Sequence, residues 1–110
     1  MDHENTRLYR TSLDLVSDAA EVIKRLPPGM GFLSDQLRRA SASVVLNFAE
    51  GCRRKSPKER ARYFEIASGS AREVSAIVDV AHRLGEVRDA PRETIKDRCD
   101  HICAMLHRFR

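Results

Sequence analysis

Apolar residues recur every three or four positions along almost the whole chain, a spacing that gathers them on one face of an α-helix. We expect a first helix from Thr6 to Leu26, because Pro27-Pro28-Gly29 follows it and breaks helices. A second helix should open at Leu33 or Ser34 and run to about Gly51.

The start of a third helix is the clearest local signal in the sequence. Ser56 is a good N-cap residue, Pro57 suits the first helical position, and Glu59 completes a capping box. Gly85 should end this third helix, and a fourth should start at Asp89 or Ala90, next to Pro91.

Four such helices predict an all-α fold, an antiparallel up-down-up-down four-helix bundle, formed by residues 1–110 as one domain. Charged residues make up 33% of the chain and aromatic residues 5%, which is typical of helical bundles and not of β folds. The expected core seams are Tyr9, Ser12, Val16, Ala19, Ile23 and Leu26; Leu33, Leu37, Ala40, Val44, Phe48 and Gly51; Phe64, Ala67, Ala71, Val74, Val78 and Ala81; and Ile95, Cys99, Ile102, Leu106 and Phe109.

The first two helices carry more apolar surface than one seam needs. The first helix has a second stripe at Leu8, Leu15 and Val22, and the second is also apolar on its far side, at Ala42, Val45, Leu46 and Ala49. A helix that is apolar on two sides needs packing partners on both, so we expect contacts with another copy of the chain.

A polar strip separates the two apolar sides of the second helix and should be at least half buried. We expect its side chains to join polar residues of the third helix in a structural network of Arg39, Ser43, Asn47, Glu50, Ser70 and Glu73. An acid/base site built on the paired carboxylates is disfavoured, because no His or Lys accompanies them at helical spacing.

Two short elements carry a family resemblance: Asn47-Phe48-Ala49-Glu50-Gly51, and the A-x-G-S-x-x-E pattern from Ala67 to Glu73. Together they resemble the four-helix-bundle family encoded in 23S rRNA intervening sequences, once labelled a ribosomal protein family. The resemblance implies an antiparallel four-helix bundle that assembles as a homopentamer. A related branch, the accessory variability determinant of diversity-generating retroelements, is implied to bind nucleic acid and a reverse transcriptase.

The expected topology gathers basic residues at one end of the bundle, although the net charge of the chain is only +4. The chain start, the turn between the second and third helices and the chain end should meet there. Candidate nucleic-acid-binding residues at that end are Arg7, Arg10, Arg53, Arg54, Lys55, Lys58, Arg60, Arg62, Arg108 and Arg110. Against these ten stand Asp2, Glu4, Glu59 and Glu65, which leaves +6 at this end.

We therefore expect a non-catalytic homo-oligomer that contacts RNA or DNA electrostatically, led by shape and phosphate contacts. The alternative is a structural or adaptor oligomer that binds a protein partner and has no nucleic-acid role. Salt separates them, because phosphate binding weakens steeply with ionic strength.

Enzymatic, metal and membrane functions find little support in the sequence. Cys99, Cys103 and His107 follow one another at helical spacing, but Cys99 lies on a core seam and is interpreted as a buried thiol, so we expect no metal and no cofactor. A di-iron bundle requires two Glu-x-x-His motifs, and the sequence has none; Asp79-x-x-His82 is the nearest pattern and stands alone. The odd number of cysteines predicts reduced thiols and a cytoplasmic protein, and no apolar run is long enough for a signal peptide or a membrane anchor.

Overall fold

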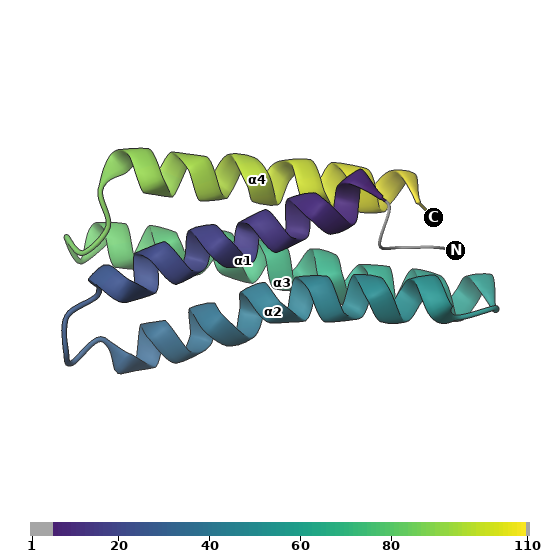
Figure 1. The fold of residues 1–110 in the computed structure, drawn as a ribbon, viewed down its shortest axis with the longest axis horizontal. Helices are drawn as coiled ribbons and strands as arrows, with labels where there is room; N and C mark the ends of the chain where they lie inside the picture. The colour runs from purple at the N-terminus through teal and green to yellow at the C-terminus, as the bar shows by residue number, and fades with distance from the viewer. Residues whose placement is uncertain (1–5, 110) are drawn as a thin grey trace.

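The computed structural model describes residues 6–109 and contains four antiparallel α-helices, shown in Figure 1. Their bounds are α1 (Arg7–Arg25), α2 (Gly31–Arg53), α3 (Pro57–Arg83) and α4 (Asp89–Arg108). α1 and α3 each pack against both α2 and α4, which places α1 diagonally across the bundle from α3. This is the predicted all-α up-down-up-down bundle, and it extends over 43 × 22 × 19 Å.

α3 starts at the predicted capping residue Ser56, and α1 is capped by Thr6, where the first helix was expected to begin. The side-chain oxygen of Thr6 accepts a hydrogen bond from the Tyr9 amide at 3.0 Å, and that of Ser56 accepts one from the Glu59 amide at 3.3 Å. Both satisfy an amide that the first helical turn leaves without a partner. α4 begins at Asp89, as expected.

α2 begins two to three residues earlier than predicted, at Gly31. Gly29 has a φ of +100° and reverses the chain directly after the two prolines. The Met30 carbonyl can then accept hydrogen bonds from the amides of Leu33 and Ser34. The sequence argument looked for a polar N-cap side chain, whereas the glycine turn makes one unnecessary.

The core is continuous along the bundle and includes the predicted seams of α2 and α3 and, apart from the half-buried Phe109, that of α4. In α1 the predicted seam is confirmed at Ser12 and Ala19, which are buried together with Leu8, Leu15 and Val22 of the second stripe. It is wrong at its other positions, because Tyr9, Val16, Ile23 and Leu26 are only half buried. Ion pairs at one edge accompany this rotation, since Arg98 of α4 lies 2.6 Å from Asp18 and 3.6 Å from Asp14. The second stripe of α1 therefore faces the core.

Three phenylalanines fill the core at the end where α2 finishes and α3 begins. The ring centroids of Phe48 and Phe64 lie 5.6 Å apart, and Phe109 sits edge-on to both at 5.6 and 6.0 Å. Phe48 and Phe64 are fully buried. Gly51 lies against this cluster, because a Cβ atom there would come within 2.6 Å of the Phe64 ring.

Asp79 joins α3 to α4 by accepting hydrogen bonds from Lys96 at 2.7 Å and Arg92 at 2.8 Å. The hydrogen bond from Lys96, together with that from Arg92, lowers the pKa of Asp79 below its ordinary value of 3.8. A lowered carboxyl pKa contributes stability above the unfolded-state pKa, and this contribution is lost as the pH falls through the folded-state value.

We therefore expect Asp79→Asn to lower the free energy of unfolding at pH 7 by up to about 1 kcal/mol, since both ion pairs are partly exposed. The difference from wild type should begin to shrink as the pH falls through 3.8, where Asp79 of the unfolded chain takes up a proton, and should be lost as the pH falls through the lower pKa of the folded state. Urea unfolding at pH 7 and pH 3 measures this. Asp97→Asn is the control, because Asp97 is exposed and forms no ion pair in residues 6–109. An equal effect of the two substitutions would contradict the assignment.

Candidate nucleic-acid interface

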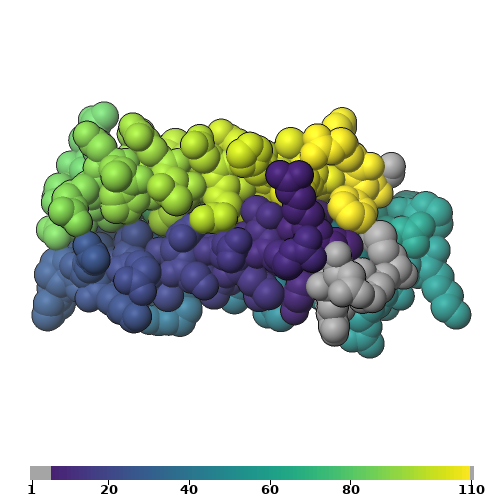
Figure 2. All heavy atoms as spheres, turned by 45° about the horizontal axis from the view of Figure 1, so that its top comes forward, coloured from purple at the N-terminus to yellow at the C-terminus, as the bar shows by residue number. Residues whose placement is uncertain are grey.

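One end of the bundle gathers the start of α1, the α2–α3 turn and the end of α4, as Figure 1 shows. In Figure 2 the teal atoms of the α2–α3 turn and the yellow atoms of the α4 end lie at the same end of the molecule. The topology thus brings together nine of the ten predicted basic residues, and we call this region the basic end. The tenth, Arg110, lies outside the described residues, as do Asp2 and Glu4.

The nine basic residues are not equivalent in exposure. Arg54 and Arg60 are half buried. The others are exposed: Arg7, Arg10, Arg53, Lys55, Lys58, Arg62 and Arg108.

Arg54 and Arg60 hold the α2–α3 turn together. Arg54 pairs with Glu50 at 2.6 Å and donates a hydrogen bond to the Tyr63 hydroxyl at 3.4 Å. Arg60 donates to the Arg54 carbonyl at 3.0 Å, and so satisfies a backbone acceptor where α2 ends. These two cations have a structural role that the sequence pattern did not indicate.

Tyr63 has its ring occupied by the protein itself. The guanidinium carbon of Arg54 lies 5.2 Å from the ring centroid, and that of Arg62 lies 5.7 Å away. Both distances are in the range of cation–π attraction. Tyr9, the other tyrosine, is half buried against the core. Neither ring is an open platform for stacking a base, so the chemistry that this end offers is positive charge.

Arg53, Lys55 and Lys58 are the cations of the turn that project into solvent without an acidic partner in the described chain. They flank the short non-helical link between α2 and α3, which Arg60 and the Ser56 cap hold in place. Three cations on a braced turn can approach a phosphate backbone together at a small cost in entropy.

The predicted polar network forms for the most part, but on the surface of the bundle. The hydroxyl groups of Ser43 and Ser70 lie 2.8 Å apart, and the Asn47 amide donates to the Ser43 carbonyl and hydroxyl at 2.9 Å. Arg39 forms an ion pair with Glu73. Glu50 does not join them, because it pairs with Arg54.

The expectation that the strip is at least half buried is wrong for its arginine. The Arg39 side chain is 60% exposed and that of Glu73 is 39% exposed. Ser70 is buried and Ser43 and Asn47 are half buried, so the network runs from the edge of the core to the outer face of the helix pair. An ion pair this exposed contributes at most about 1 kcal/mol to folding.

Exposed apolar side chains flank the network on the same face. Leu46 is 66% exposed and Phe32 of the same helix is 55% exposed, while Ile66 and Val80 of α3 are 40% and 48% exposed. The register set by the Ser43–Ser70 contact places Leu46 level with Ile66 and Phe32 level with Val80. We call these four residues and the network between them the α2–α3 face. Of the second apolar side predicted for α2, only Val45 is buried.

The cysteines behave as core thiols, as predicted for Cys99. Cys52 and Cys99 are buried, Cys103 is half buried, and all three are free. Burial raises the pKa of all three thiols, and that of Cys99 to about 12. The described part of the chain contains no group of three or more His, Cys, Asp or Glu residues arranged to hold a metal ion. Likewise, none of the helices in residues 6–109 combines the length and the apolar character that crossing a membrane requires.

Two comparisons with known proteins give matches. Residues 4–108 match the model of a protein family described as 23S rRNA-intervening sequence protein. A crystal structure from Bacteroides thetaiotaomicron, described as a protein with unknown function from the S23 ribosomal protein family, superposes with a TM-score of 0.85. It is 19% identical in sequence, and the match covers 93% of this chain and 96% of that one. No curated protein matches the chain by sequence.

Proposed function

This chain belongs to the 23S rRNA-intervening sequence protein family, and from that premise we propose that it is a non-catalytic homo-oligomer that binds nucleic acid through its basic end. The observation that carries the proposal is the set of three solvent-facing cations without acidic partners, Arg53, Lys55 and Lys58, on a turn braced by other residues. The family name refers to 23S rRNA, which makes structured RNA the first ligand to test.

The expected binding mode is electrostatic. Cations that neutralise phosphates release condensed counterions, and the binding constant then falls steeply with salt concentration. Two guanidinium groups already lie within cation–π distance of the Tyr63 ring, so base stacking on this ring adds little to the binding free energy. Discrimination between nucleic-acid sequences should therefore be weak. An oligomer that presents several basic ends on one side would add the phosphate contacts of its subunits together.

The test is a salt series of RNA and DNA-duplex affinities for wild type and for Arg53→Gln/Lys55→Gln/Lys58→Gln. The plot of log binding constant against log salt should flatten by about 0.9 for each duplex phosphate that the variant no longer neutralises, and by somewhat less on single strands. A matched control removes three exposed arginines elsewhere, Arg38, Arg72 and Arg83. Equal slopes for the two variants would show that charge alone acts, irrespective of its position.

The α2–α3 face supports the homo-oligomeric part of the proposal. It combines four exposed large apolar side chains with a polar network that only the α2–α3 pair completes, and apolar groups of this size gain free energy when a partner covers them. The occupant that we propose is a second copy of this chain. The family resemblance implies five copies in all.

Leu46→Glu should lower the mass measured by multi-angle light scattering to that of smaller species. The substitution leaves the core intact because Leu46 is 66% exposed, but it places a charge within the proposed contact. His101→Glu adds a charge to the exposed surface of α4 and should leave the mass unchanged. A wild-type monomer at micromolar concentration would overturn the proposal of self-association.

The exposed apolar face also favours a second candidate function, a structural or adaptor oligomer whose partner is another protein. Absence of RNA and DNA binding at low salt, together with an intact oligomer, would select this candidate. Binding of a protein partner through apolar contacts would then persist at high salt, unlike phosphate binding.

A further inference from the structure

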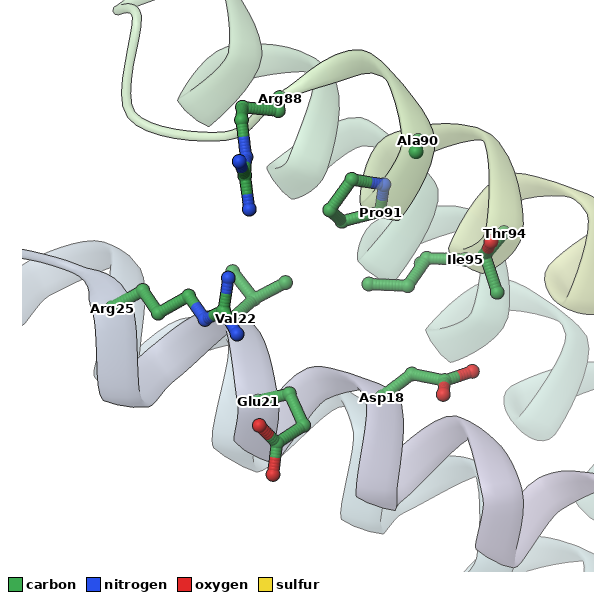
Figure 3. Close-up of a pocket in the computed structure, with 9 residues that line it drawn as sticks. All are labelled: Asp18, Glu21, Val22, Arg25, Arg88, Ala90, Pro91, Thr94 and Ile95. Atoms are coloured by element: carbon green, nitrogen blue, oxygen red, sulfur yellow. The ribbon is translucent and has the colours of Figure 1, made fainter.

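A hollow of about 410 Å³ lies between α1 and α4 at the end of the bundle opposite the basic end. α1 and α4 run side by side along one face of the molecule, as Figure 2 shows. The floor of the hollow is apolar and consists of Val22 from α1 and Pro91 and Ile95 from α4 (Figure 3). Val22 and Ile95 belong to the core, so the floor is fixed by the packing of the bundle.

Two arginines face each other across this hollow. Arg25 is the last residue of α1, and Arg88 immediately precedes α4. Figure 3 shows the Arg88 side chain extending from the start of α4 toward α1, where the Arg25 guanidinium group lies beside Val22. Neither arginine forms an ion pair within residues 6–109. Two positive charges that converge without a counter-charge leave a position between them that favours an anion.

The two carboxylates that line the hollow form ion pairs with cations outside it. Asp18 pairs with Arg98 at 2.6 Å and Glu21 pairs with Lys24 at 3.2 Å. Arg25 and Arg88 are the charged side chains of the hollow that no ion pair engages in the described residues.

Two further acidic residues lie near the hollow and must be considered. Glu86 borders an adjoining depression that shares both arginines, but it forms no ion pair with Arg25 or Arg88 in the described structure. Asp89 points toward α3, where one of its oxygens lies 2.6 Å from the Nε2 atom of His82. Neither carboxylate takes the place of a ligand between the two arginines.

We propose that this hollow binds a small organic oxyanion, with a carboxylate or phosphate group held between Arg25 and Arg88 and an attached apolar group resting on Val22 and Ile95. Planar guanidinium groups bind either oxyanion through paired hydrogen bonds. The volume is larger than a bare oxyanion needs and lies in the range of ligand pockets, about 300–1,000 Å³. The site is independent of the basic end, and it lies on the side of the bundle away from the α2–α3 face.

The test is an NMR titration of the full chain with phenyl phosphate, benzoate and inorganic phosphate. Amide signals of Val22, Arg25, Ala90 and Ile95 should shift, and those of the 53–58 turn should not. Arg25→Gln and Arg88→Gln should each weaken binding by about tenfold, the effect of losing one charge-assisted hydrogen-bonding partner. Arg83→Gln, an exposed arginine at the same end that does not line the hollow, should have no effect.

Ala90→Phe tests whether the space in the hollow is needed for binding, because it leaves both arginines in place. Ala90 is exposed near the start of α4, so a larger side chain there should fill the hollow without disturbing the core or either arginine. The phenyl-bearing probes should then lose their affinity. Stronger binding of phenyl phosphate than of benzoate identifies a phosphate ester as the ligand class, and the reverse order identifies a carboxylate.

Three results would overturn the proposal. The first is the absence of signal changes at millimolar concentrations of every probe. The second is an equal loss of affinity in all three arginine variants, which would mean diffuse surface charge. The third is unchanged binding of the phenyl probes to a folded Ala90→Phe protein. None of these results bears on the basic end, which the salt series tests separately.

Discussion

Phe48→Ala is expected to lower the free energy of unfolding by about 3–5 kcal/mol, the range for removing a buried phenylalanine. The Phe48 side chain is fully buried and contacts Phe64 face to face and Phe109 edge-on, so the substitution removes two aromatic contacts and leaves a cavity among three helices. A domain of this size is stable by about 5–15 kcal/mol, so the variant should stay folded but unfold at clearly lower urea concentration.

Phe32→Ala is the matched control for this prediction. Phe32 belongs to the same helix but is 55% exposed, so its loss should change stability by less than about 0.5 kcal/mol in the monomer. If Phe48→Ala cost less than about 1 kcal/mol, the aromatic cluster would have to collapse into the cavity with little strain. Because the cluster lies beneath the α2–α3 turn, the same variant should also bind nucleic acid more weakly.

Gly51→Ala is expected to destabilise the protein by about 1–3 kcal/mol, the usual cost of inserting a methyl group into a packed core. The added Cβ would lie 2.6 and 2.8 Å from two ring atoms of Phe64 and 3.1 Å from the Tyr63 Cβ. The Phe64 ring cannot move away freely, because Phe48 and Phe109 hold it on two sides.

Gly69→Ala should raise the free energy of unfolding, whereas Gly51→Ala should lower it. Gly69 lies on the exposed surface of α3 and an added Cβ would meet no atom within 4 Å. Alanine is favoured over glycine inside a helix by about 0.5–1 kcal/mol, so this variant should be more stable than wild type. Thermal unfolding of Gly51→Ala and Gly69→Ala measures the two changes in stability relative to wild type. Stabilisation by both substitutions would contradict the close approach of α2 to α3 at Gly51.

Local chemistry made much of the fold predictable. Ser56 and Pro57 define a helix start by themselves, and Gly85 adopts the positive φ that ends α3, so both boundaries were readable without tertiary information. The rotation of α1 was not readable, because its two apolar stripes are adjacent on the helix. Which stripe is buried depends on the packing against α2 and α4, which the sequence pattern of α1 alone does not contain.

The candidate sites likewise contain a part that the sequence predicts and a part that only the folded structure reveals. The basic end could be predicted because it requires only the number and direction of the helices. The roles of Arg54 and Arg60 could not, because they depend on which carboxylate, carbonyl and ring the folded turn brings within reach. The position of Arg25 and Arg88 beside the same hollow could not be predicted either. Two helices separate them in the sequence, and neither belongs to a motif.

The placement of both described chain ends at the basic end has a practical consequence for protein engineering. A purification tag or fluorescent protein joined at either terminus would emerge beside the α2–α3 turn and compete with a large ligand for access to it. The links between α1 and α2 and between α3 and α4 lie at the other end of a bundle 43 Å long. Labels for surface attachment or energy-transfer measurements therefore belong in the α1–α2 link, because the α3–α4 link contains Arg88 of the hollow.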